Sequence, residues 1–189
     1  RKRWRTPKSW LLDPGYFCDD IRIKSFVCKR MKQGFSFGLH PSYDSFECSS
    51  IFVAEQNRLN NALEIEVELV RQHWLRFSWK NTWKIQESAG LTSDATMGFN
   101  DRPGFRCGAA LEYIPWDCEN ITSVPVVMMD SHFYSYDVMD ADKRRKLMFE
   151  LIKEVINVRG VACVNWHPHT ISDDYSWLDG YMELLDILS

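Results

Sequence analysis

Three of the five histidines stand at or just beyond the ends of predicted strands. His40 follows the stretch FSFGL, His73 follows a strand that reaches Val70, and His167 follows VACVNW. A histidine changes charge near neutral pH and binds zinc through a ring nitrogen, so it is suited to proton transfer and to metal binding. A single histidine at a strand end is more often structural. Three of them together indicate a hydrolytic or metal site.

Charged residues accompany these histidines. Arg71, Asp44 and Asp101 lie in the same kind of position, near or after predicted strands. In parallel β/α folds the loops after the carboxyl ends of the strands build the site, so we expect these side chains and the strand-end histidines to share one cleft. The other two histidines, His132 and His169, lie in polar loop stretches, which favours an ordinary structural role.

The elements that position these residues follow from the spacing of apolar side chains. Helical spacing predicts helices over 20–33, 49–64, 81–89, 140–158 and 177–188. Short apolar runs predict strands within 35–40, 67–77, 124–130 and 161–167, and the glycine-rich stretch 92–108 is expected to be a long loop. Strands that alternate with helices indicate parallel β/α units, in a barrel or in an open sheet. No repeat or linker divides residues 1–189, so we expect one domain.

Composition excludes several partners. The formal net charge of −3 gives no general attraction to nucleic acid or to anionic membranes. The basic cluster near the start is predicted to be a solvated terminal segment; it consists of Arg1, Lys2, Arg3, Arg5 and Lys8. The six cysteines form no C-x-x-C pair, which favours free thiols in a reducing compartment. With no signal peptide or long apolar run visible, we expect a cytoplasmic location.

Four segments resemble motifs of the polysaccharide deacetylase family, the NodB-homology proteins. They are GLHPSYDSF (38–46), RQHWLRF followed by NTW (71–83), SDATMGFNDRPGFRCG (93–108) and NWHPH (165–169). The resemblance covers nearly the whole chain. It implies a distorted (β/α)7 barrel that holds a divalent metal, usually zinc, through one aspartate and two histidines. It also implies a second aspartate as base, an arginine that orients it, and a late histidine as acid.

The resemblance assigns metal ligands by motif position. His40 resembles the first metal-binding histidine, and Asp44 stands where the second would be. This exchange of imidazole for carboxylate changes the charge of the site. His73 is a possible substitute ligand because it lies near Arg71.

The resemblance also assigns catalytic and substrate-binding roles. Arg71 resembles the orienting arginine, Asp101 the aspartate of the fourth motif, and His167 the late acid. The proline expected after Arg71 is missing. The residues expected to contact a sugar are Trp74, Trp166 and Arg106.

The family's Asp-Asp motif, which supplies the base and a metal ligand, has no convincing counterpart. The pair Asp19-Asp20 sits at a predicted helix start, and we expect Asp19 to cap that helix. We therefore expect the motif and its strand to lie upstream of Arg1, and this stretch alone to be inactive.

These observations favour a metal-dependent hydrolase that removes N- or O-acetyl groups from a polysaccharide or oligosaccharide. Two alternatives stay open. One is a non-catalytic carbohydrate-binding relative, favoured by Asp44 and by the altered third motif. The other is a different metal-dependent amide or ester hydrolase, with a nucleotide or lipid substrate.

Overall fold

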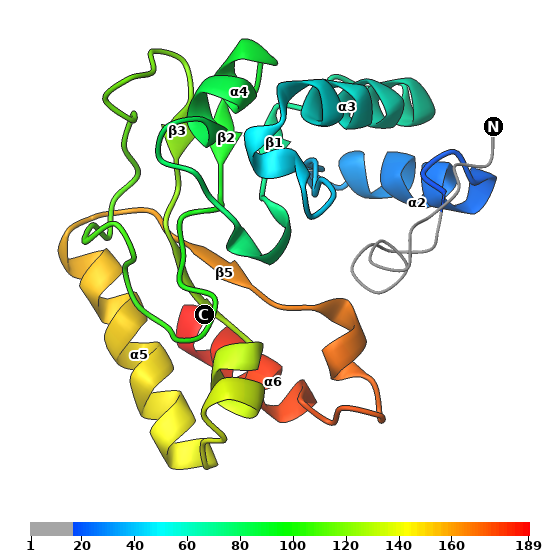
Figure 1. Ribbon diagram of the computed structural model, residues 1–189. Coiled ribbons are helices and arrows are strands. Elements are labelled where there is room, and N and C mark those ends of the chain that lie inside the picture. The colour runs from blue at the N-terminus through cyan, green and yellow to red at the C-terminus, as the bar shows by residue number, and fades with distance from the viewer. Residues whose placement is uncertain (1–16) are drawn as a thin grey trace. The chain divides into compact units, whose positions relative to one another are not determined.

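The computed structural model describes residues 17–189 (Figure 1). The chain divides into two compact units. The described part of unit 1 comprises residues 17–94 and 114–122, and unit 2 comprises residues 95–113 and 123–189. The expected basic terminal segment lies outside the described residues.

Three helices of unit 1 match the predicted ones within a few residues: α2 (Ile21–Met31), α3 (Ser49–Leu63) and α4 (Thr82–Ser88). Helix α2 begins at Asp20, whose carboxylate accepts a hydrogen bond from the Arg22 backbone N–H at 2.9 Å. The capping residue is therefore Asp20, one position after the predicted Asp19, because a side-chain oxygen caps best from the position just outside the first turn. Two short 3-10 turns, η1 (Ser45–Glu47) and η2 (His73–Leu75), complete the helical part of unit 1.

The three-stranded sheet has the order β1-β2-β3, with β1 at Leu69–Val70 and β2 at Ser93–Asp94. Strand β3 is Thr122–Ser123, and its second residue is counted with unit 2. Strands β1 and β2 are parallel. The predicted strand 35–40 is reduced to a parallel bridge between Leu39 and Val70. Glycine is required at position 38, because a Cβ there would lie 2.8 Å from the Leu69 carbonyl oxygen.

Unit 2 is built on the parallel strands β4 (Val126–Met129) and β5 (Cys163–Asn165). Helix α5 (Ala141–Asn157) connects them, as expected for a parallel pair, and helix α6 (Leu178–Leu188) ends the chain. Two short helical segments follow the strands: η3 (His132–Tyr136), a π-helical turn, follows β4, and η4 (Pro168–Ile171) follows β5.

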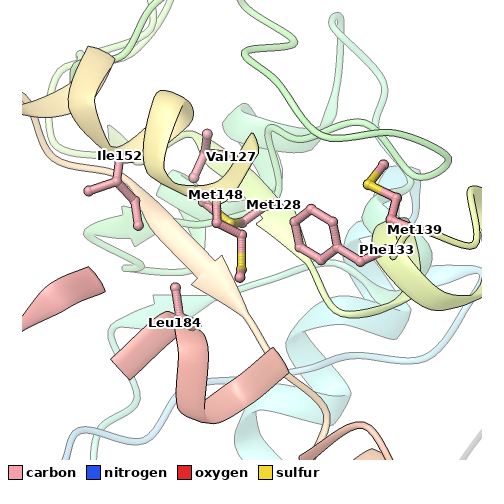
Figure 2. Close-up of a cluster of buried hydrophobic side chains, with 7 residues drawn as sticks. All are labelled: Val127, Met128, Phe133, Met139, Met148, Ile152 and Leu184. Atoms are coloured by element: carbon pink, nitrogen blue, oxygen red, sulfur yellow. The ribbon is translucent and has the colours of Figure 1, made fainter. Parts of the chain in front are cut away.

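A hydrophobic cluster holds these elements together. Figure 2 shows its side chains from β4, α5 and α6 pointing toward one another. The members are Val127, Met128, Phe133, Met139, Met148, Ile152 and Leu184. All of them are buried, so the cluster fixes both helices against the strand pair whose carboxyl ends carry Asp130 and His167.

Helices α5 and α6 are also joined by a part-buried ion pair. The Arg144 side chain is 3% exposed and donates to both carboxylate oxygens of Glu183, at 2.8 and 2.9 Å. It also donates to Asp179 at 2.9 Å. These paired charges fix the register of the two helices, because an arginine buried without its carboxylates would be strongly unfavourable.

The predicted mixed α/β class with parallel strands is confirmed. The stretch 92–108 begins with β2 and otherwise contains turns and bends, as predicted for a loop. Within residues 17–189, no helix has the length and apolar character needed to span a membrane. The expectations of a closed barrel and of one domain stay predictions.

Candidate functional site

The strongest candidate for chemistry in unit 2 is a carboxylate–imidazole pair. Asp130 follows β4 directly, and His167 follows β5 with one residue, Trp166, between them. The His167 Nδ1 and the Asp130 Oδ1 are 2.7 Å apart. Because an ionised carboxylate only accepts, Nδ1 carries the proton and Nε2 points away from Asp130. The Asp130 side chain is fully buried, whereas that of His167 is 41% exposed, so the imidazole is open to a substrate.

Three further donors hold the Asp130 carboxylate. Oδ2 accepts from the His167 backbone N–H at 2.9 Å and from the Thr170 hydroxyl at 2.8 Å, while Oδ1 accepts from the Ser131 N–H at 2.8 Å. Burial alone would raise the pKa of Asp130, but the hydrogen bonds from His167 and Thr170 outweigh it and hold the pKa below its usual value. Asp130 is therefore an ionised anchor that fixes the ring and the backbone of His167.

This pairing follows from the topology. Strands β4 and β5 are parallel neighbours, so their carboxyl ends lie at the same edge of the sheet. The sequence prediction placed His167 at this edge but gave Asp130 no role. The available signal was an aspartate directly after one buried strand and a histidine after the next.

The predicted catalytic residue Asp101 lies elsewhere in unit 2. Its side chain is 60% exposed and pairs with Arg102 at 3.2 Å, and the Arg102 guanidinium lies 4.0 Å from the centre of the Phe99 ring. The carboxylate that contacts His167 is that of Asp130. A catalytic role for Asp101 stays a prediction.

His132 holds the same loop against the end of β4. Its ring is buried; Nδ1 accepts from the Met129 N–H and Nε2 lies 3.2 Å from the Phe99 carbonyl oxygen. Burial lowers the pKa of His132, so the ring is neutral and donates from Nε2. The structural role predicted for this histidine fits the contacts.

Unit 1 gathers a second group of predicted residues. The rings of His40 and His73 have centroids 4.9 Å apart, tilted by 55°. The His40 Nδ1 lies 2.7 Å from the Arg71 carbonyl oxygen, which fixes the proton on Nδ1 and leaves the lone pair on Nε2. The Arg71 guanidinium forms no ion pair within residues 17–189. The structure therefore brings together two of the three predicted ligands, beside the predicted arginine.

Asp44 is held by Arg76, which the sequence analysis did not single out. The Arg76 Nη1 donates to the Asp44 carboxylate at 3.1 Å and to the Tyr43 carbonyl oxygen at 2.8 Å. The guanidinium also lies 3.9 Å from the centre of the Tyr43 ring and 4.1 Å from that of Phe46. Arg76 thus fixes the loop that follows His40.

Backbone strain marks the adjacent turn. Trp74 and Leu75 have φ values of 58° and 49°, a region that side chains other than glycine rarely adopt. The Trp74 side chain is 52% exposed and lies edge-on to Tyr43, with ring centroids 6.1 Å apart. Such strain concentrates at functional sites, which is consistent with a substrate-contacting Trp74.

The other two predicted substrate contacts lie in unit 2. Trp166 packs against the hydrophobic cluster, and its indole nitrogen is buried without a partner among the described residues. Arg106 donates to the Gly98 carbonyl oxygen at 3.2 Å. Both contacts tie these side chains to the interior of the unit, and their predicted contact with sugar stays a prediction.

The histidines of unit 1 fit a metal in part. A zinc ion lies about 2.0–2.1 Å from an imidazole nitrogen, hence about 3.2 Å from the ring centre, and two ligating rings have centres no more than about 6.4 Å apart. The His40–His73 separation of 4.9 Å meets this limit. Within residues 17–189, however, no three His, Cys, Asp or Glu side chains gather as a metal site. The geometry of the pair is compatible with two ligands of a site but not with a complete set.

His40 and His167 belong to different units. Their expected sharing of one cleft therefore stays a prediction.

Comparison with solved structures shows the fold. The chain resembles a crystal structure described as that of a "putative polysaccharide deacetylase" from Mycobacterium smegmatis, with a TM-score of 0.60 and 15% sequence identity. The match covers 87% of this chain and 61% of the other, so the chain spans about three fifths of that protein's length. No protein-family model and no curated protein matches the sequence. The fold is therefore deacetylase-like.

Proposed function

We propose that this chain is part of a metal-dependent hydrolase that removes N- or O-acetyl groups from a polysaccharide or oligosaccharide. The observation that carries the proposal is the Asp130–His167 pair, at the carboxyl ends of neighbouring parallel strands in a deacetylase-like fold. In such folds this edge of the sheet is where chemistry takes place.

His167 is the proposed general acid. Its Nδ1–H is bound to Asp130, so Nε2 is the atom that delivers a proton to the departing amine or alkoxide. Asp130 orients the ring and stabilises the imidazolium form without itself becoming protonated. The low pKa of Asp130 suits this role, since the carboxylate stays ionised over the whole neutral range.

His40 and His73 are the proposed histidine ligands of a divalent metal, with zinc as the best match for two imidazoles. When bound, such a metal polarises an acyl carbonyl and makes water more acidic. The Arg71 carbonyl would orient His40 as a ligand through Nδ1. Arg71 itself and Trp74 are proposed to position the substrate, the first by charge and the second by its exposed ring.

A non-catalytic carbohydrate-binding protein is the second candidate. It is favoured by the lack of a three-residue metal group among the described residues and by the engagement of Asp44 with Arg76. Such a protein would bind acetylated sugars through exposed aromatic rings without releasing acetate. A cytoplasmic location belongs to either proposal.

The test compares acetate release with binding. The chain and the full-length protein are incubated with acetylated chitooligosaccharides, acetylated xylan and an unrelated acetyl ester, with and without zinc. The proposal expects zinc-dependent acetate release from the carbohydrates by the full-length protein. Binding of carbohydrate without release supports the second candidate, and release from the unrelated ester alone points to a different hydrolase.

Calorimetric zinc titration of the full-length protein tests the metal ligands separately. Replacing either ring, in His40→Gln or His73→Gln, should abolish the tight zinc-binding event. His132→Gln is a histidine control outside the proposed site; its ring is bound to backbone groups on both sides. Unchanged zinc binding in the first two variants would remove these residues from the proposal.

A further inference from the structure

A second pair of histidines lies in unit 2. The rings of His167 and His169 have centroids 5.6 Å apart and are tilted by 55°. Pro168 separates them in sequence and begins the turn η4. The polar stretch around His169 predicts only a structural role for it.

Within residues 17–189, the His167 Nε2 and both ring nitrogens of His169 form no hydrogen bond. Two imidazoles with unused nitrogens therefore lie side by side. His169 is exposed. In the described part of the chain its ring contacts one aromatic ring besides that of His167, namely Tyr175, which lies edge-on with the two ring centroids 5.1 Å apart. The Tyr175 contact limits the orientations of the ring without occupying a nitrogen.

The separation suits one shared metal ion. With each ring centre about 3.2 Å from the ion, centroids 5.6 Å apart correspond to an N–metal–N angle of about 120°, near the tetrahedral value. The Asp130–His167 contact completes the carboxylate–histidine–metal arrangement that usually orients a metal-binding imidazole through its second nitrogen.

The chemistry of the donors selects the ion. Two neutral imidazoles favour borderline transition-metal ions such as Zn²⁺ and Ni²⁺, whereas Mg²⁺ and Ca²⁺ require oxygen ligands. Among the described residues no third His, Cys, Asp or Glu joins the pair, so a metal bound there would take its remaining ligands from water.

We propose that His167 and His169 form a transition-metal site distinct from the His40–His73 pair, and that a metal bound there inhibits the enzyme. Inhibition follows because the ion occupies Nε2 of His167, the atom that carries the proton in the proposed reaction. Only this inhibitory consequence rests on the proposed function. The binding site stands on the geometry of unit 2.

Binding is tested by NMR of the imidazole nitrogens and protons during titration with Ni²⁺, whose paramagnetism broadens nearby signals. The expected result is broadening of His167 and His169; that of His167 should be lost in His169→Gln, and both should broaden as before in His40→Gln, whatever happens to the signals of His40 and His73. Asp130→Asn should weaken this Ni²⁺ binding by about 10- to 100-fold, as loss of an orienting partner does. Mg²⁺ should leave both signals unchanged. Equal broadening in the wild type and His169→Gln would overturn the site.

Inhibition is tested as the ratio of acetate-release rates at high and low Zn²⁺ within each variant. The wild type should slow down at high Zn²⁺, and the ratio should return to near one in His169→Gln. A wild type without inhibition, but with the expected Ni²⁺ broadening, would overturn the regulatory part and keep the site. A protein that releases no acetate under any condition contradicts the proposed function and leaves the binding result to stand.

Discussion

Replacing Asp130 by asparagine should destabilise unit 2 for a reason that can be worked out atom by atom. Oδ2 accepts from the His167 N–H and the Thr170 hydroxyl, and Oδ1 accepts from the Ser131 N–H and the His167 ring. An asparagine can present its oxygen to only one of these sides. Its NH₂ group then faces the donors on the other side. The Thr170 hydroxyl can rotate and the His167 ring can change its tautomer to accept from this NH₂ group, but a backbone N–H can only donate.

One part-buried backbone N–H therefore loses its acceptor in either orientation, the Ser131 or the His167 N–H. Such a loss costs about 1–3 kcal/mol, and exchanging charge-assisted hydrogen bonds for neutral ones removes about 1 kcal/mol more. We expect Asp130→Asn to lower the free energy of unfolding by about 2–4 kcal/mol, which is a fall in Tm of roughly 5–15 °C for a domain of this size.

Urea and thermal unfolding followed by circular dichroism measure the loss. The matched control is Asp101→Asn, which removes a carboxylate whose side chain is 60% exposed. This variant should have a free energy of unfolding within about 0.5 kcal/mol of the wild type. If Asp130→Asn unfolds at the wild-type temperature, the hydrogen-bond network around Asp130 does not stabilise the protein as argued.

Three other outcomes follow from the packing and charges of unit 2. Arg144→Met leaves the Glu183 carboxylate, which is 20% exposed, without its partner, and urea unfolding should show a loss of about 1–3 kcal/mol. Gly98→Ala places a Cβ 2.7 Å from the Val126 carbonyl oxygen, so its Tm should fall by the equivalent of about 1–3 kcal/mol, and an unchanged Tm would contradict this close approach. The pKa of Asp130 is lower in the folded than in the unfolded protein, so ionisation of this carboxyl stabilises the folded state. This stabilisation is complete above the unfolded-state pKa of about 3.9 and is lost as the pH falls through the folded-state pKa. The stability difference between wild type and Asp130→Asn should therefore narrow below about pH 4 in acid titrations of unfolding.

Helices were the most predictable part of the fold. Helices α3 and α5 carry apolar residues at helical spacing, and Asp140 accepts from the Lys143 N–H as a cap of α5, so local sequence determines where α5 begins. Strands were less predictable. Strand β3 has only two residues, too few to show the alternation of apolar and polar side chains by which a strand is predicted, and it forms only by pairing within the sheet.

The candidate site was predictable only in part. The strand-end positions of His40 and His167 follow from local patterns, because each ends an apolar run. The role of Asp130 depends on a contact with a residue 37 positions away, which only the parallel pairing of β4 and β5 creates. The same holds for Arg76, whose contact with Asp44 joins two loops of unit 1.

The central claim is that His167, held by Asp130, delivers the proton in a carbohydrate deacetylation. The most direct measurement is the rate of acetate release from acetylated chitooligosaccharides by the full-length protein and by its His167→Gln variant, at saturating substrate and equal zinc. The account predicts that the variant is slower by a factor of about 10² to 10⁴, the usual contribution of a general acid, while it stays folded. Equal rates for the two proteins would contradict it.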